Sequence, residues 1–275
     1  MRATSPVLRA VRFLGIGGVL ALAAVVFMAL AVLAPGVIAP GDPAAIDPSR
    51  ALLSPRWGAW FGTDESGRDV WTRVIHGSAP SLGVGLAATG IGATIALVLG
   101  FASGLGPRWL DTGITRIIEV LYALPTMVLA LLLVAIRGPG VAASVLAVGL
   151  ATAPGYARIL RARTRSVASS GYVSSARLEG RAPGWVLRRH ILPNALWPLA
   201  SVLTLGVGQA VVWVAALSFL GLGALPPSSE WGAMLNAGRI YLGRAWWLTV
   251  GPGLAITVTA AALTVLGRRL GRVAP

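Results

Sequence analysis

The chain has 275 residues, of which 56% are hydrophobic and 12% are charged, and its formal net charge is +14. Because soluble domains carry about 25% charged residues, we expect much of this apolar surface to face lipid. Cysteine does not occur, which excludes disulfides and thiolate chemistry, and two histidines far apart in the sequence argue against a metal centre, so no metal site is expected.

Six stretches without Asp, Glu, Arg or Lys follow one another along the chain. Because a helix needs about 20 apolar residues to cross the hydrocarbon core, they predict an all-α membrane protein with six transmembrane helices. The first run has 21 residues, longer than a signal-peptide core of about 7–15, and is read as a retained anchor. Pro125 and Pro154 fall inside runs, where membrane helices tolerate proline. The predicted spans are Phe13–Leu33, Leu82–Leu105, Val120–Ile136, Val141–Ala157, Leu196–Leu220 and Trp246–Leu266.

The arginines are unevenly divided between the segments that join these runs. If the N-terminus is cytoplasmic, 16 arginines fall inside the cell and 7 outside, as the positive-inside rule requires. The excess positive charge then faces anionic lipid and cytoplasmic partners, which argues against a nucleic-acid partner. We therefore expect a multi-pass protein of the bacterial inner membrane with both termini in the cytoplasm. Tryptophans at the predicted span ends fit an interfacial belt: Trp109, Trp197, Trp246 and Trp247.

The sequence predicts three units, residues 1–36 with the first span, an outer segment 37–80, and a core 81–275. In the outer segment, Ser66 and Asp69 are expected to cap a short helix, and Asp69 to pair with Arg73 one turn later. Gly77 is a plausible end of that helix, and Ser81 a plausible cap of the second span. Two interpretations stay open, a surface helix at the membrane face and an element that faces an outer partner. The helix carries an apolar stripe of Val70, Val74 and Ile75.

A cytoplasmic loop at residues 158–195 begins with four arginines and continues with helix signals. Ser169 or Ser170 can cap a helix that runs to Glu179, and Gly180 permits the turn that ends it. Pro183 suits the first turn of a second helix, which is expected to stop near Pro193. Such a hairpin suits docking in a groove of a soluble partner, and a basic loop adhering to anionic lipid is the alternative.

This loop resembles a segment of a known family. The order Ala176, Gly180 and Ile191-Leu192-Pro193 is similar to the EAA loop of binding-protein-dependent ABC importer permeases. Four motifs in family order resemble the C-type permease of the dipeptide/oligopeptide/nickel family. They are Phe61-Gly62-Thr63-Asp64 with Gly67-Arg68-Asp69-Val70, Arg189 to Ala195, Leu217 to Gly223, and Pro226-Pro227 with Trp231 to Leu235.

The chain also departs from the family pattern. Ser174 and Ser175 stand where the EAA motif has its glutamate and first alanine, and Glu179 occupies a usually apolar position. Val214 or a neighbour replaces the acidic residue expected before the Leu217 motif. A salt bridge from the usual glutamate therefore cannot be carried over, whereas docking by shape can.

The resemblance implies a type I ABC importer permease fold with a cytoplasmic coupling helix, and a translocation subunit that is not itself an enzyme. Expected partners are a second, B-type permease, two cytoplasmic ATPase subunits or a fused one, and an extracytoplasmic solute-binding lipoprotein in addition to the lipid bilayer. ATP and Mg would bind the ATPases, because this chain contains no P-loop pattern. The residues expected to couple to an ATPase are Tyr172, Ser174, Ser175, Ala176, Arg177, Gly180 and Pro193. The residues expected to contact the binding protein are Asp64, Arg68, Asp69 and Trp231.

Short peptides are the substrate that the resemblance favours, and nickel or another small solute is the alternative. A secondary transporter is a function of a different class, but no ionisable residue lies mid-span in the predicted runs. A membrane enzyme is a third class, and the single acidic cluster near His76 fits capping and ion pairing better. Polar residues of the predicted spans are candidates for the translocation path, although helix–helix hydrogen bonding is the favoured explanation: Thr126, Thr204, Gln209 and Ser218.

Overall fold

A computed structural model describes residues 6–273, with side chains described from residue 15 to residue 272. Arg2 and the side chains of Arg9 and Arg12, which contribute to the predicted charge bias, lie outside this part. The described residues form only helices and loops. The helices are α1 (Pro6–Leu33), α2 (Pro35–Ile38), η1 (Pro48–Arg50), α3 (Val70–His76), α4 (Ser78–Leu105), α5 (Arg108–Tyr122), α6 (Thr126–Arg137), α7 (Val141–Ala168), α8 (Gly171–Leu178), α9 (Pro183–Val186), η2 (Leu187–Ile191), α10 (Leu192–Phe219), α11 (Trp231–Gly238), η3 (Arg239–Tyr241) and α12 (Trp247–Val273).

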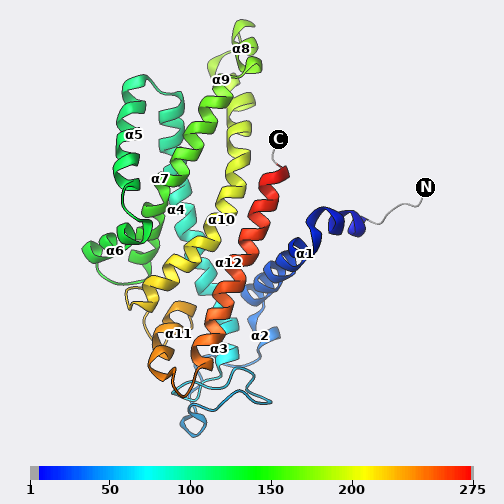
Figure 1. Cartoon of the computed structure of the whole chain (residues 1–275), viewed down its shortest axis with the longest axis vertical. Coiled ribbons are helices and arrows are strands. Elements are labelled where there is room, and N and C mark those ends of the chain that lie inside the picture. The colour runs from blue at the N-terminus through cyan, green and yellow to red at the C-terminus, as the bar shows by residue number, and fades with distance from the viewer. Residues whose placement is uncertain (1–5, 274–275) are drawn as a thin grey trace, which may run out of the picture.

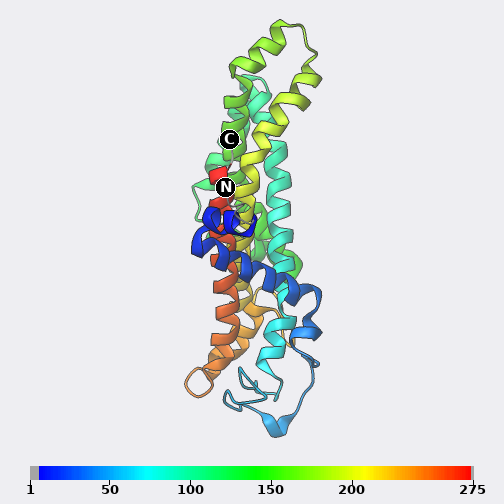
Figure 2. The same cartoon turned by 90° about the vertical axis from the view of Figure 1, so that its right-hand side faces the viewer.

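Long helices run side by side along the longest axis of the molecule (Figure 1). The helices α8 and α9 stand at one extreme, which we call the hairpin end. Residues 39–69 with α3 and α11 stand at the other, which we call the cap end (Figures 1 and 2). Helix α1 crosses the bundle obliquely at mid-height and packs against α12.

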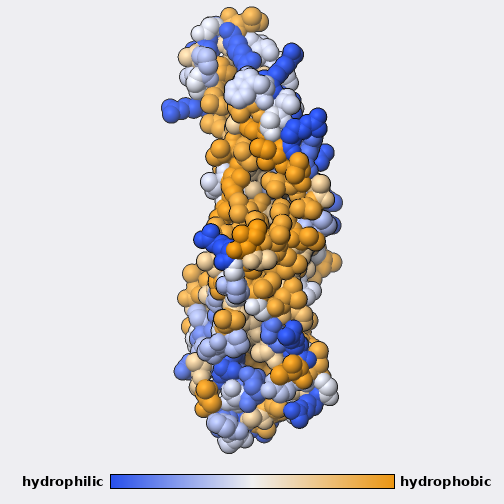
Figure 3. All heavy atoms as spheres, turned by 90° about the vertical axis from the view of Figure 1, so that its left-hand side faces the viewer, coloured by the Kyte–Doolittle hydropathy of each residue, from blue (hydrophilic) through white to orange (hydrophobic). Residues whose placement is uncertain are grey.

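The surface of this bundle carries a broad apolar band between two polar ends (Figure 3). Within the described residues, five helices are long and apolar enough to cross a membrane, and a bent pair would make a sixth. A band of this kind is what a bilayer-spanning bundle presents to lipid. The prediction of a helical multi-pass membrane protein is therefore confirmed.

The third predicted span differs from expectation. Instead of one helix over residues 120–136, α5 and α6 meet at 91°. Pro125 causes the break, because it has no N–H to donate and disfavours helical backbone at the preceding residue. Pro125 is itself extended, with φ −55° and ψ 131°. Proline is tolerated inside α7, where Pro154 lies, but at residue 125 it ends a helix.

Helix α7 extends well beyond its apolar run, through the four arginines that were assigned to a loop, and ends at Ala168. The chain then turns at Ser169 and Ser170 into α8, as predicted, although Ser170 makes no capping hydrogen bond to the helix. Gly180 has φ 76°, the left-handed backbone that the predicted turn requires.

The return helix does not stop near Pro193 as expected. Between α9 and α10 lies a π-helical turn, η2, in which the Leu192 N–H bonds to the Leu187 carbonyl five residues earlier. Pro193 has no backbone N–H to donate to a helical hydrogen bond. The wider π-helical turn accommodates this residue, so the helix continues. Residues 183–219 consequently form one helical run of 37 residues.

The bundle is centred on α4 and α7, whose backbones approach closely where glycines face each other. A Cβ added at Gly149 would lie 2.9 Å from the Ala88 carbonyl oxygen, and one added at Gly92 would lie 3.0 Å from the Gly149 carbonyl oxygen. Small residues permit such close packing of membrane helices. Farther along, Gly100 packs against Leu160 in the same way.

Candidate functional site

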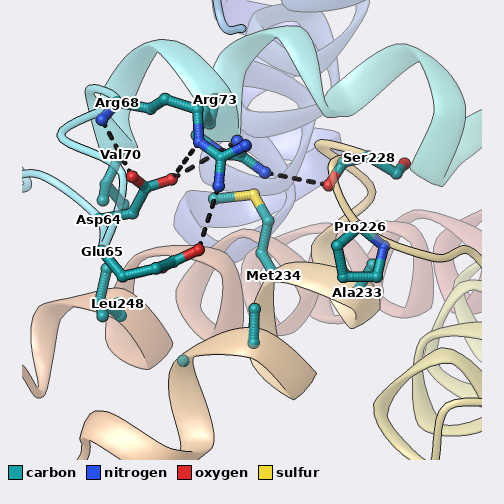
Figure 4. Close-up of a pocket in the computed structure, with 12 residues that line it drawn as sticks. Asp64, Glu65, Arg68, Val70, Arg73, Pro226, Ser228, Ala233, Met234 and Leu248 are labelled. Atoms are coloured by element: carbon teal, nitrogen blue, oxygen red, sulfur yellow. Dashed lines mark hydrogen bonds and ion pairs between the residues drawn. The ribbon is translucent and has the colours of Figure 1, made fainter. Parts of the chain in front are cut away.

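The cap end is organised around a buried carboxylate. Asp64 accepts a hydrogen bond of 2.7 Å from Arg68 Nε, and its Oδ2 lies 3.5 Å from Arg73 Nη1. Arg73 in turn donates to the carbonyls of Pro227 and Ser228, about 150 residues away in sequence. These groups border a cavity of about 60 Å³ beside Met234 (Figure 4). Asp64 thus ties the loop before α3 to the loop before α11.

Helix α11 is fastened to the same cap by a buried tryptophan. Trp231 is fully buried, its Nε1 donates to the Val74 carbonyl, and its backbone N–H donates to Ser81 Oγ. Glu230 caps the helix, since its two carboxylate oxygens accept the N–H groups of Gly232 and Ala233. Burial raises the pKa of Glu230 above its ordinary value, and the two N–H groups oppose that rise.

These contacts correct several local predictions. Asp69 alone caps α3 by accepting from Thr72, Ser66 takes no part, and Arg73 pairs with Asp64 instead of Asp69. Gly77 does end α3, but α4 begins at Ser78, so Ser81 lies within α4 and not at its cap.

The short helix α3 is buried on its predicted apolar stripe and at Thr72 and Arg73, which excludes a helix lying loosely on a surface. Trp247 is also buried, and its Nε1 donates to the Thr63 carbonyl, so it packs inside the cap. The other three predicted belt tryptophans are exposed.

Asp64, Arg68 and Trp231 are therefore internal, and Asp69 is half-buried. They shape the cap surface from beneath. Contact of this surface with a binding protein stays a prediction.

A recess of about 580 Å³ opens between α5, α6, α7 and α10. Its wall includes Thr126 and Gln209, two of the four predicted path residues. Thr204 and Ser218 are not part of it. Thr204 donates to the Ala200 carbonyl of its own helix, and Ser218 accepts from Ala224 N–H near the cap. Sequence reasoning missed Thr152, Tyr156 and Arg158, which also line the recess.

The hairpin α8–α9 has a small apolar core of its own. Val173, Ala176, Val186 and Ile191 are buried together with Val167 of α7. Of the predicted coupling residues, Ala176 belongs to this core, whereas the remainder face outward: Tyr172, Ser174, Ser175, Arg177, Gly180 and Pro193. The hairpin is therefore a formed knob with an exposed, largely polar surface.

A cluster of charged groups joins three helices below the hairpin. Asp111 of α5 accepts from Ser103 Oγ of α4 at 2.6 Å, and both of its oxygens bond to Arg161 of α7 at 2.6 and 3.0 Å. Arg165, one turn farther along α7, reaches the same carboxylate at 2.6 Å. A two-point arginine–carboxylate pair fixes orientation as well as distance, so α5 is held to the extension of α7.

Comparison with known proteins adds to this geometry. Residues 96–274 match the family described as binding-protein-dependent transport system inner membrane component. Over 224 residues the chain is 36% identical to a dipeptide transport system permease protein, DppC, of Alkalihalophilus pseudofirmus, covering 82% of this chain and 74% of that protein. It is 39% identical over 223 residues to a probable D,D-dipeptide transport system permease protein, DdpC, of Escherichia coli, with coverages of 81% and 75%.

The fold has counterparts among solved structures. A chain from the crystal structure of an amino acid ABC transporter with histidines superposes with a TM-score of 0.58 at 19% identity, covering 73% of this chain and 93% of that one. At this identity the likeness concerns the fold alone. The arrangement of helices described above is thus that of an ABC transporter permease.

Proposed function

This chain belongs to the family of binding-protein-dependent transport system inner membrane components, and from that membership we propose that it forms half of the translocation pathway of an ATP-driven importer of short peptides. The names of the relatives, which are dipeptide permeases, support peptides as the solute class. The proposed form is a C-type permease that works beside a second, B-type permease.

One observation carries the proposal: the exposed hairpin and the recess share the same two helices. Helices α7 and α10 hold the hairpin between them at one end, and both line the recess farther along. A displacement of the hairpin is therefore a displacement of the recess wall. This is the mechanical link that a transport subunit driven by a separate motor requires.

In the proposed complex, the hairpin seats in a cleft of a cytoplasmic ATPase subunit through its outward-facing residues, among them Tyr172, Ser174, Ser175 and Arg177. Shape and the backbone turn at Gly180 contribute where the family glutamate is replaced by Ser174. ATP and Mg bind the ATPases, and hydrolysis takes place there. The cap end faces outward and receives the solute-binding lipoprotein, supported from beneath by the Asp64 network and Trp231.

Transport then proceeds as alternating access. The binding protein delivers a peptide at the cap end while the ATPases draw together and push the paired hairpins. Since α5 is bonded to α7 through Asp111, the push reaches both walls of the recess. The bent pair α5–α6 and helix α10 part or close around the solute as rigid bodies.

Reconstitution tests this function. The chain, its partner permease, the ATPases and the binding protein are placed in proteoliposomes, and uptake of a radiolabelled dipeptide is measured with and without ATP, alongside uptake of Ni²⁺. We expect ATP-dependent dipeptide uptake that requires the binding protein. Uptake of Ni²⁺ alone would replace the peptide assignment, and uptake driven by an ion gradient without the ATPases would indicate a secondary transporter.

Single cysteines test the orientation, because the chain has no native cysteine. Ser175 at the hairpin and Ser54 at the cap end are both exposed. We expect a membrane-impermeant thiol reagent to label Ser175→Cys only from the cytoplasmic side and Ser54→Cys only from outside. The opposite labelling pattern would invert the topology and remove the proposed ATPase contact.

A further inference from the structure

The recess between α5, α6, α7 and α10 adjoins a second hollow of about 430 Å³ between α5 and α7, and the two share the side chains of Tyr122 and Arg158. The guanidinium carbon of Arg158 lies 5.9 Å from the centroid of the Tyr122 ring. Arg158 therefore stands where the two hollows meet, and Glu119 and Arg161 also line the second hollow.

Arg158 differs from its neighbours on the same helix. Arg158, Arg161 and Arg165 follow one another at intervals of three and four residues, which places them on one face of α7. Asp111 forms salt bridges to both Arg161 and Arg165. Within the part of the chain that the structure describes, Arg158 makes no salt bridge, and the Tyr122 ring is its one charge-related contact. Of these three arginines, Arg158, which lines the recess, is thus the one that remains available to bind an anion.

The recess offers further donors beside this cation. Trp213 of α10 lines it, and the buried Nε1 of Trp213 has no hydrogen-bond partner among the described residues. Gln209 is exposed one turn away on the same helix. A charged donor at one side and neutral donors at another match a solute with one anionic end and an amide or carbonyl elsewhere.

We propose that Arg158 binds the free carboxylate of the transported solute, and that this site makes the pathway selective for peptides with an ionised C-terminus. A guanidinium forms two parallel hydrogen bonds to a carboxylate, and Arg158 is exposed at the recess with no carboxylate bonded to it among the described residues. This inference rests on the proposed peptide transport and names the group of the peptide that the chain recognises.

An oxyanion could also come from a lipid headgroup phosphate, which a guanidinium at a membrane protein's surface can reach. The two sources differ in what they respond to. A solute site responds to the chemistry of the peptide terminus, whereas a lipid site responds to the composition of the bilayer. The experiment below therefore varies both.

The test uses the complete transporter in proteoliposomes and measures uptake of a dipeptide and of its C-terminal amide. Because the binding protein is the same throughout, its own preference cancels when the acid-to-amide ratio is compared between variants. We expect Arg158→Gln to lower that ratio at least about tenfold, a change that corresponds to about 1.4 kcal/mol. Arg158→Lys keeps the positive charge but lacks the two parallel N–H donors of a guanidinium, so it should give an intermediate acid-to-amide ratio. Arg137→Gln, an exposed arginine at the end of α6 outside both hollows, should leave the ratio unchanged.

If Arg158→Gln fails to assemble, Arg158→Lys alone decides the matter. An acid-to-amide ratio equal to that of the parent chain in each assembled variant overturns the inference while leaving peptide transport intact. The inference is also overturned if the parent and the Arg158 variants have the same acid-to-amide ratio while uptake by the parent falls in bilayers without anionic lipid. That result would assign the Arg158 guanidinium to a lipid phosphate. Failure of the parent transporter to take up either peptide form refutes the proposed function itself.

Discussion

Asp111 and Arg161 form a two-point ion pair between α5 and α7, with Oδ1 2.6 Å from Nε and Oδ2 3.0 Å from Nη2. Replacement of Asp111 by asparagine leaves Arg161 and Arg165 side by side without a counter-charge. Because the carboxylate is largely buried, we expect a loss of about 1–3 kcal/mol in the free energy of unfolding. Thermal unfolding of the purified chain in nanodiscs measures it, at about 2–4 °C per kcal/mol for a chain of this size.

Glu119→Gln is the control for this variant. It removes the pair of Glu119 with Arg116, which has a similar separation of 3.0 Å but side chains that are 55% and 78% exposed. Exposed pairs contribute little, so the unfolding free energy should change by less than about 0.5 kcal/mol. Equal losses in Asp111→Asn and Glu119→Gln would contradict the role of Asp111 in joining the helices.

The contact between α4 and α7 predicts a strong dependence on glycine. A methyl group at residue 149 would press against the carbonyl of Ala88 and the side chain of Ile91. We expect Gly149→Ala to reduce stability by about 1–3 kcal/mol through overpacking. A Cβ at Gly90 of α4 meets nothing within 4 Å, so Gly90→Ala should be neutral or slightly stabilising. Unfolding of both variants in nanodiscs decides whether this close approach is required.

The turn of the hairpin predicts a coupling phenotype. Gly180 has φ 76°, and no atom lies within 4 Å of a Cβ added there, so a side chain would strain only the backbone. We expect Gly180→Val to distort the turn and to raise the ATP hydrolysed per peptide transported at least about threefold, since a strain of roughly 1–2 kcal/mol disfavours the docked shape. Gly184→Val, at a nearby open position without positive φ, serves as the control. An unchanged ATP-to-peptide ratio in Gly180→Val would show that the turn is not needed for coupling.

The buried cap of α11 predicts a pH dependence. Burial raises the pKa of Glu230, so the folded chain holds this proton more tightly than the unfolded chain. Stability from this group is therefore fully present below the ordinary carboxyl pKa and is lost as pH rises through the raised value. Glu230→Gln should remove that loss, although it replaces one of two N–H acceptors at the helix start by an NH₂ group. The unfolding temperature of Glu230→Gln minus that of the parent, followed from pH 4 to 8 (about the working range of carboxyl titration), should increase with pH, because only the parent loses stability. Glu179→Gln, exposed on the hairpin, should show no such trend. A variant-minus-parent difference that decreases with pH would contradict the assignment.

Much of the bundle follows from local sequence, because five of the six uncharged runs form long membrane helices, as their length and hydropathy predict. The hairpin is predictable as well, since Gly180 and Pro183 act through the backbone of their immediate neighbours. The bend at Pro125 also has a local cause, but a hydropathy profile treats this proline as one more residue of an uncharged run and therefore does not reveal the bend.

The charged parts escaped prediction for a different reason. The extension of α7 is held in place by Asp111, 50 residues earlier, which bonds to its arginines, and the cap is tied by Arg73, which donates to carbonyls about 150 residues away. The spacing of residues along the sequence does not identify partners that are so far apart in the chain. Asp69 and Arg73 stand one turn apart and could pair, yet the fold offers Arg73 a better-placed carboxylate in Asp64.

The π-turn at residues 187–191 removes a joint that Pro193 would otherwise create. Without it, the helix would break near Pro193 and the hairpin would be joined to α10 through a bend. With it, residues 183–219 form one helical run about 55 Å long at 1.5 Å per residue. In the proposed transporter, a displacement of the hairpin would therefore reach the wall of the recess along one continuous helical run.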